Sequence, residues 1–354
     1  MKVNKSTNKN GRLEIGVIYG PGGHIHGGTA ASINGVDRTR FTNMQVTMGW
    51  SFRKDVAEEV AKKAGFTVVK HFDDMVGKVD GLMIDDFYAL PFVHKLAKPY
   101  FESKIPIYFN RPFINSLPKA RSIIESAKKF GVPIMTGTWY EFTQEAAIIR
   151  NHVKNLGKDI TGYCAHNATG HFYTHGIHGL NWVHKCICQG FEGGKVRAIS
   201  FEADSLDGPN GIITLEHEGR DGGEPFYGCL HENSPGRSRV WIKIYSPKET
   251  FEHSIFKGLD IRWGWEWSHD IVWALPLELS MQRMFETGDM PESYDDIYHK
   301  TELFIGAFKS FKEHGGRTVA LTDIGDWDAG IPTREEFGSR AYSEAEIKEW
   351  ERMF

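Results

Sequence analysis

The chain has 354 residues, of which 40% are hydrophobic, so it can form two domains or one large one. Its formal net charge of -4 offers no basic footprint for nucleic acid or an anionic membrane, which favours a small-molecule substrate. No apolar run approaches the roughly 20 residues of a membrane helix, and residues 1–12 lack the apolar core of a secretion signal. We therefore expect a cytoplasmic protein with a disordered tail over residues 1–12.

A glycine-rich stretch follows the first predicted strand. The apolar run over residues 13–19 ends in glycines, and small residues from Thr29 onward open a helix. Glycines in such a turn let backbone amides approach a phosphate at a helix N-terminus. The turn residues that we expect to contact a nucleotide are Gly20, Gly22, Gly23, His24 and Ile25. Ile25 stands where the dinucleotide fingerprint has its third glycine, so an ordinary glycine-rich turn is an equal alternative.

Up to about residue 135, short apolar runs alternate with helical patterns. The runs predicted to be strands cover residues 13–19, 44–50, 66–69, 80–84, 106–109 and 132–137. This alternation is typical of a parallel sheet with right-handed crossovers, which binds ligands at the carboxyl ends of its strands. A helix over residues 141–155 follows. We therefore predict an α/β Rossmann-like dinucleotide-binding domain over residues 13–155.

The pattern becomes strand-rich after residue 155. The predicted strands cover residues 160–166, 196–204, 211–218, 225–232, 239–246 and 250–258, and helices follow near 269–287 and 293–314. Few helices separate the strands, which favours a large, open, mostly antiparallel sheet in an α+β substrate and oligomerisation domain over residues 156–324. Residues 325–354 form a C-terminal arm. Its last helix has Ser343 as N-cap and Glu346 as capping-box partner.

Two segments resemble the Gfo/Idh/MocA family of sugar and cyclitol dehydrogenases. The stretch from VDGLMIDD to TGTWYEF has the family's order and spacing of strands and helices, with His94 and Pro112 at matching places. The segment THGIHGLNWVHKCICQG resembles the helix that faces the nicotinamide, with Gly176 and His178 in register. The resemblance covers roughly residues 13–324. It implies an oxidoreductase that uses NAD or NADP on a hydroxyl of a sugar, glycoside or cyclitol, in which the cofactor can stay bound and recycle.

The chain departs from the family at the catalytic motifs. Asn110 and Arg111 replace the family's Glu-Lys before Pro112, and Thr174 replaces its aspartate. A guanidinium stays protonated at physiological pH, so Arg111 cannot take a proton but can orient and polarise a substrate oxygen. These departures leave open a non-redox protein, either a metal-dependent lyase or a catalytically silent ligand-binding or scaffold protein.

Five histidines lie close together in the sequence: His166, His171, His175, His178 and His184. On a helix, His171, His175 and His178 would share one stripe with Trp182. A general base, a metal site formed by the three histidines, and structural packing are the alternatives. We favour His178 as the base because it stands at the family's position, with Thr174 and His175 beside it, and we assign no metal.

The end of the second strand bears on cofactor choice. Ser51 stands where an NAD enzyme has an acid for the ribose diol, and Arg53 follows, which favours NADP. Asp85, Asn110, Arg111 and Pro112 at the ends of later strands are also assigned to the cofactor. Residues assigned to the substrate are Tyr140 and Glu141, which follow the sixth strand, and His171 and Trp182.

Trp263, Trp265 and Trp267 would share one face of a strand. They form either a platform for a sugar ring or, as we prefer, a face packed against a helix or a second subunit. The resemblance implies a homo-oligomer formed through the C-terminal sheet. The four cysteines are too sparse for a disulfide framework, so we expect reduced thiols.

Overall fold

The computed structural model describes residues 11–21, 30, 32–35, 41–168, 171–191, 194–207, 210–219, 224–233, 240–254, 275–330 and 332–354. The chain divides into two compact units. Unit 1 comprises Met1–Gly137, Trp267–Tyr294 and Gly330–Phe354, and unit 2 comprises Thr138–Glu266 and Asp295–Ala329. Unit 1 thus includes a helix that the sequence-based division assigns to the second domain, and most of the C-terminal arm.

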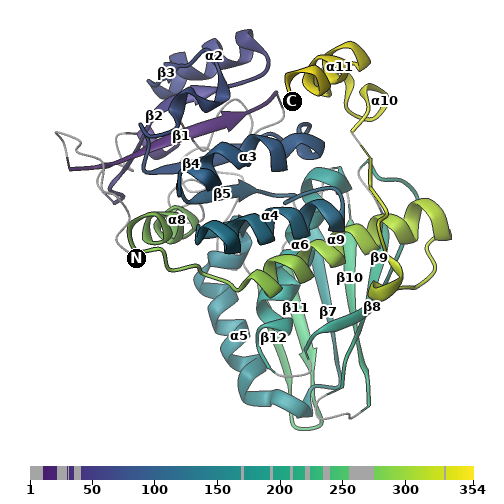
Figure 1. Ribbon diagram of the computed structural model, residues 1–354. Helices are drawn as coiled ribbons and strands as arrows, with labels where there is room; N and C mark the ends of the chain where they lie inside the picture. Colours follow the sequence, from purple (N-terminus) through teal and green to yellow (C-terminus); the bar gives the residue numbers. More distant parts are fainter. Residues whose placement is uncertain are drawn as a thin grey trace. The chain divides into compact units, whose positions relative to one another are not determined.

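Unit 1 is built on a sheet of six parallel strands in the order β3-β2-β1-β4-β5-β6 (Figure 1). The strands are β1 (Leu13–Tyr19), β2 (Met44–Trp50), β3 (Thr67–Val68), β4 (Gly81–Asp85), β5 (Ile107–Asn110) and β6 (Ile134–Gly137). The predicted runs 13–19 and 44–50 coincide with β1 and β2. The Rossmann-like class predicted from the alternating pattern is confirmed.

The helices of unit 1 whose bounds the structure describes are α2 (Lys54–Ala64), α3 (Val93–Glu102), α4 (Leu117–Phe130), α8 (Leu275–Thr287), α10 (Arg334–Phe337) and α11 (Glu344–Met353). Short 3-10 turns are η2 (Phe72–Met75), η3 (Leu90–Phe92) and η11 (Gly338–Arg340). Helix α8 packs so closely on β4 that a Cβ on Gly81 would lie 2.8 Å from the Phe285 ring. The predicted capping box of the last helix is confirmed, since the Glu346 amide donates to the Ser343 hydroxyl.

Unit 2 contains a seven-stranded sheet in the order β12-β11-β7-β10-β9-β8-β13. The strands are β7 (Gly162–Ala168), β8 (Val196–Ala203), β9 (Gly211–His217), β10 (Phe226–Asn233), β11 (Trp241–Tyr245), β12 (Thr250–Ser254) and β13 (Val319–Ala320). Among these pairs only β7 and β10 run parallel, so the predicted mostly antiparallel sheet is confirmed.

The long helices of unit 2 are α5 (Gln144–Leu156) and α9 (Tyr294–His314), which begins at the last residue of unit 1's middle segment. The short helix α6 (Ile177–Val183) continues from the π-helical turn η6 (Phe172–Gly176) into a second one, η7 (His184–Cys188). The 3-10 turns are η4 (Trp139–Phe142), η5 (Gly157–Asp159) and η10 (Leu321–Asp323).

Aromatic rings join η6, β8 and α9 in the core of unit 2. The Phe172 ring stacks on Phe201 at 4.3 Å and contacts Phe308 at 5.2 Å. The four cysteines are free, as expected. Among the described residues, no helix combines the length and apolar character required to cross a membrane.

Candidate active site

The carboxyl edge of the parallel sheet in unit 1 brings together Gly20, Asp85 and Asn110. Asn110 Nδ2 donates to Asp85 Oδ1, and the Arg111 amide donates to Asn110 Oδ1 at 2.9 Å. A side chain on Gly20 would overlap the carboxylate of Asp86, so this glycine is required by the contact with Asp86. The sequence analysis assigned Gly20 to phosphate approach and overlooked Asp86.

Asp86 is a buried carboxylate that connects the sheet edge with the C-terminal arm. Its Oδ1 accepts from the amides of Tyr88 and Ala89 at 3.0 and 3.2 Å, and its Oδ2 accepts from the Tyr342 hydroxyl at 2.6 Å. Burial raises the pKa of Asp86 to about 6, against the lowering effect of these three hydrogen bonds. The signal available in the sequence was an aspartate directly after a buried strand.

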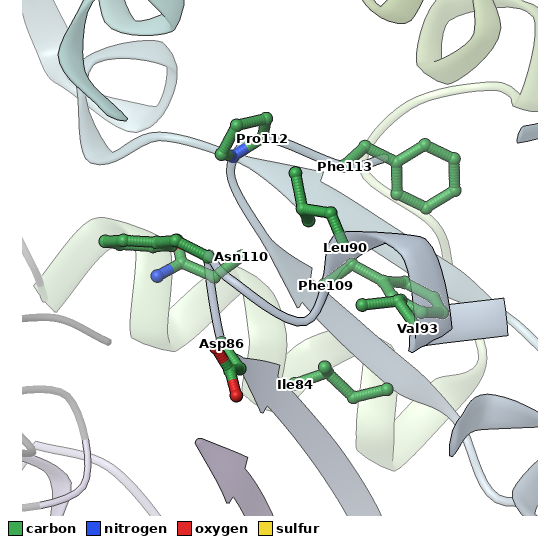
Figure 2. Close-up of a pocket in the computed structure, with 9 residues that line it drawn as sticks. Ile84, Asp86, Leu90, Val93, Phe109, Asn110, Pro112 and Phe113 are labelled. Carbon is green, nitrogen blue, oxygen red and sulfur yellow. The ribbon is translucent and has the colours of Figure 1, made fainter. Parts of the chain in front are cut away.

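Arg111 follows β5 and is itself buried, with its guanidinium 4.9 Å from the centre of the Phe87 ring. A small cavity lies nearby, lined by Ile84, Asp86, Phe87, Leu90, Val93, Phe109, Asn110, Pro112 and Phe113. Figure 2 shows Leu90, Val93 and Phe109 on one side of it and Asp86 and Asn110 on the other. It has room for roughly a single water molecule.

Two residues after β2, Ser51 and Arg53, were predicted to bind the cofactor, and they differ in their hydrogen bonding. The Ser51 hydroxyl is buried, and no described residue forms a hydrogen bond with it. The Arg53 guanidinium donates to Glu346 at 2.7 Å and to the carbonyl oxygens of Ser339 and Ala341 at 2.8 and 2.9 Å. The structure does not support the preference for NADP. The Arg53 guanidinium, which was predicted to bind the 2′-phosphate, is bound instead by residues of the C-terminal arm.

His178 lies in unit 2, buried on α6 among aromatic and polar side chains. Its ring stacks on Tyr140 with a centroid distance of 4.9 Å and lies 6.1 Å from the Trp139 ring. The His175 ring is 5.8 Å away, and Thr174 Oγ1 forms a hydrogen bond with His175 Nδ1 at 2.7 Å. The structure therefore brings together four of the predicted residues, His178, His175, Thr174 and Tyr140.

The predicted stripe of His171 and Trp182 with these histidines depends on regular helical spacing. The π-helical turn η6 changes that spacing, and His171 is the N-cap, whose Nδ1 accepts from the Tyr173 amide at 3.1 Å. Trp182 is fully buried. The structure does not group His171, His175 and His178 as a possible metal site among the described residues.

Glu141 forms a buried ion pair with Lys300 of α9, at 2.8 Å between Oε1 and Nζ. Its other oxygen accepts from the Thr138 amide at 2.6 Å and from Asn181 Nδ2 at 3.1 Å. Glu141 thus connects η4, which carries Tyr140, with α6, which carries His178. Lys300 was overlooked in the sequence because it lies 159 positions from Glu141.

The remaining predicted site residues lie outside the described residues. They are Gly22, Gly23, His24 and Ile25 of the glycine turn and the aromatic residues Trp263, Trp265 and Trp267.

No protein-family model and no curated protein sequence matches this chain. Its fold is similar to that of myo-inositol dehydrogenase from Lactobacillus casei in complex with NAD(H) and myo-inositol, with TM-score 0.68, 13% identity, and 91% of this chain and 99% of that chain covered. GenD2 from gentamicin A biosynthesis in complex with NAD matches with TM-score 0.68, 15% identity, and 90% and 99% covered. A probable dehydrogenase from Thermotoga maritima matches with TM-score 0.66, 16% identity, and 88% and 100% covered. The resemblance to Gfo/Idh/MocA dehydrogenases is confirmed at the level of the fold.

Proposed function

We propose that this chain is an NAD(H)-dependent oxidoreductase that acts on a hydroxyl of a cyclitol, sugar or glycoside in carbohydrate metabolism. The observation that carries the proposal is the buried His178, stacked on Tyr140, on the helix that the family resemblance assigns to catalysis. The fold is shared with dehydrogenases that were crystallised with NAD(H), one of them with an inositol.

The residues of unit 1 fit a dinucleotide in part. Ser51 presents a buried hydroxyl that needs a partner at the end of β2, where a parallel sheet of this class holds a ribose. Arg53 is already bound by Glu346, which favours NAD(H) over NADP(H). The bound cofactor would accept a hydride from the substrate carbon. Ser51, Asp85 and Asn110 are the described residues that we assign to holding it.

His178 takes the proton of the substrate hydroxyl in this proposal. A neutral imidazole accepts a proton near neutral pH, and the stacked Tyr140 ring fixes its plane. His175, held by the Thr174 hydroxyl, is the second imidazole of the group. Glu141 and Lys300 are positioning residues, because Glu141 joins η4 to Asn181 of α6 and Lys300 pairs with Glu141 from α9.

Arg111 remains our candidate for orienting an oxygen atom. It replaces the family's lysine and keeps its positive charge, so it serves as a fixed donor and not as a base. The Phe87 ring lies against its guanidinium, in a cation–π contact that helps to orient it.

A homo-oligomer formed through the sheet of unit 2 is also part of the proposal. Ile212 on β9, Tyr227 on β10 and Tyr245 on β11 are 45%, 55% and 40% exposed. An exposed set of aromatic and aliphatic side chains on a sheet favours a contact with a second subunit. Light scattering of the wild type and of Tyr227→Glu tests this, with loss of the larger species expected in the variant.

The activity is tested by incubating the purified chain with NAD+ and a panel of inositol isomers, aldoses and glycosides. We expect absorbance of NADH to develop with at least one polyol. Saturable NAD+ binding without reduction by any polyol would instead favour the catalytically silent alternative.

A further inference from the structure

In unit 2, apart from His178, three side chains of types that commonly bind metal ions lie close together. One ligand atom from each of His184, Cys188 and His299 lies within 4.8 Å of the other two. His184 and Cys188 belong to η7, and His299 belongs to α9. Within the described residues this is the one group of three or more histidine, cysteine or carboxylate side chains that could hold a metal ion.

The two histidines of the group are buried, and Cys188 is partly buried. His184 and His299 are 1% and 4% exposed, and their rings lie 5.3 Å apart. His184 and Cys188 are the first and last residues of the same π-helical turn. Buried imidazole nitrogens normally have hydrogen-bond partners, because an unsatisfied one costs about 1–3 kcal/mol. Nδ1 of His184 has no such partner.

Each imidazole has a carboxylate beside its other nitrogen. His299 Nδ1 lies 3.1 Å from Glu302 Oε2, and His184 Nε2 lies 3.9 Å from Asp296 Oδ1. Metal-bound histidines usually have a hydrogen-bonded carboxylate behind them, which fixes the tautomer and orients the ring, and Glu302 takes that place for His299.

We propose that His184, Cys188 and His299 bind a zinc ion. Two imidazoles and a thiolate are a donor set that zinc prefers, and a water molecule would complete four-fold coordination. Ligand atoms that bind zinc at about 2.0–2.3 Å lie roughly 3.3–3.8 Å from one another. The three ligand atoms, now within 4.8 Å of one another, would therefore approach each other by about 1 Å on binding.

Zinc binding would also rearrange one backbone hydrogen bond. The Val196 amide donates to His299 Nε2 at 3.2 Å, and the same amide lies against Cys188. When His299 Nε2 binds the ion, the amide keeps the thiolate as its acceptor. The site would join η7 to α9 and so stabilise the helix that carries His178, which is a structural role.

Cobalt is a spectroscopic substitute for zinc. We would remove metal from the purified full chain with a chelator and titrate it with cobalt(II). The wild type should develop visible bands of tetrahedral cobalt and a thiolate-to-cobalt charge-transfer band, saturating at about one ion per chain. Cys188→Ser should lose the charge-transfer band, and Glu302→Gln should weaken binding by roughly 10- to 100-fold.

Cys186→Ser is the matched control, because Cys186 is a free, buried thiol on the same turn but outside the group. It should keep the full cobalt spectrum, and zinc should raise the melting temperature of this control and of the wild type but not of Cys188→Ser. Absence of cobalt bands in the wild type would overturn the proposal, whatever the stability of the variants. Equal loss of the band in both cysteine variants would overturn it as well.

Discussion

His178 is the residue on which the proposed chemistry depends. His178→Ala removes the proton acceptor, so we expect kcat to fall by roughly 10²- to 10⁴-fold, the usual contribution of a general base. His175→Ala is the matched control, since its ring lies 5.8 Å from His178 on the same helical segment, and it should lose less. Steady-state kinetics on the polyol identified by the panel measures both. Near-wild-type turnover in His178→Ala would move the base to His175 or Tyr140.

The ion pair of Lys300 and Glu141 is the second residue-scale feature. Both side chains are almost completely buried, so Lys300→Met leaves an uncompensated carboxylate and should cost about 3–5 kcal/mol of unfolding free energy. Glu141→Gln in the same chain should recover much of the loss. Lys63→Met is the control, because Lys63 forms an exposed pair with Glu59 that contributes little. Denaturant unfolding that gives equal, small losses for both lysine variants would contradict the assignment.

Single residues show how far the sequence allowed prediction. His178 and Tyr140 were predicted as site residues, and the structure places their rings in contact. Arg53 was predicted as a phosphate ligand from its position after β2. Its partner Glu346 lies 293 positions away, so no local pattern could reveal the ion pair. Asp86 was missed for the same reason, since its tyrosine partner is 256 positions away.

The C-terminal helix α11 is attached to unit 1 by Trp350. This side chain is fully buried and stacks between Phe52 at 4.7 Å and Phe92 at 5.1 Å. Trp350→Ala should destabilise unit 1 by about 3–5 kcal/mol and weaken NADH binding, because Phe52 follows Ser51. Met353→Ala, at a side chain that is 39% exposed, should change neither. Denaturant unfolding and NADH titration of both variants check the prediction, and equal behaviour would contradict it.

Asp86, which joins the sheet edge to the C-terminal arm through Tyr342, makes the stability of unit 1 depend on pH. The folded pKa of Asp86 is about 6, above the 3.8 of an ordinary aspartate, so its contribution to stability is complete below about 3.8 and is lost as pH rises through 6. Asp86→Asn removes this loss. Relative to the wild type, the variant should gain up to about 3 kcal/mol of unfolding free energy between pH 4 and pH 8.

Glu346→Gln is the control, because the pKa of Glu346 is shifted in the opposite direction to that of Asp86. Burial raises the pKa of Glu346, but hydrogen bonds from Arg53 and Ser343 outweigh it and lower the pKa to about 2. Its contribution is therefore present above about 4.5 and is lost as pH falls toward 2. Thermal unfolding from about pH 2 to about pH 8 covers the ranges of both variants. Parallel pH profiles for the wild type and Asp86→Asn would refute the role of Asp86.

Elements with strong periodicity were predictable, and irregular ones were not. Strands β1 and β2 were predicted residue for residue, because buried strands between glycine and polar turns have clear limits. The two π-helical turns around α6 have no comparable pattern, so the sequence did not reveal that the turn at His175 is π-helical and that His171 is its N-cap.

At the scale of the whole molecule, both sheets were predictable from the order of strands and helices. Alternation predicts the parallel sheet of unit 1, and a run of strands predicts the mostly antiparallel sheet of unit 2. The grouping of α8 and α11 with unit 1 was not predictable, because it rests on contacts such as that of Phe285 with Gly81 and of Trp350 with Phe52. Local sequence patterns do not show which residues far apart in the chain will be in contact.

The proposed cofactor is tested most directly by calorimetric titration of the purified wild-type chain with NADH and, separately, NADPH. The protein is first shown by mass analysis to carry no bound nucleotide. We expect saturable NADH binding at about one site per chain and at least roughly 10-fold weaker NADPH binding, because Arg53 is held by Glu346 and not free for a 2′-phosphate. No binding heat with either nucleotide would contradict the proposal that this chain is a nicotinamide-dependent oxidoreductase.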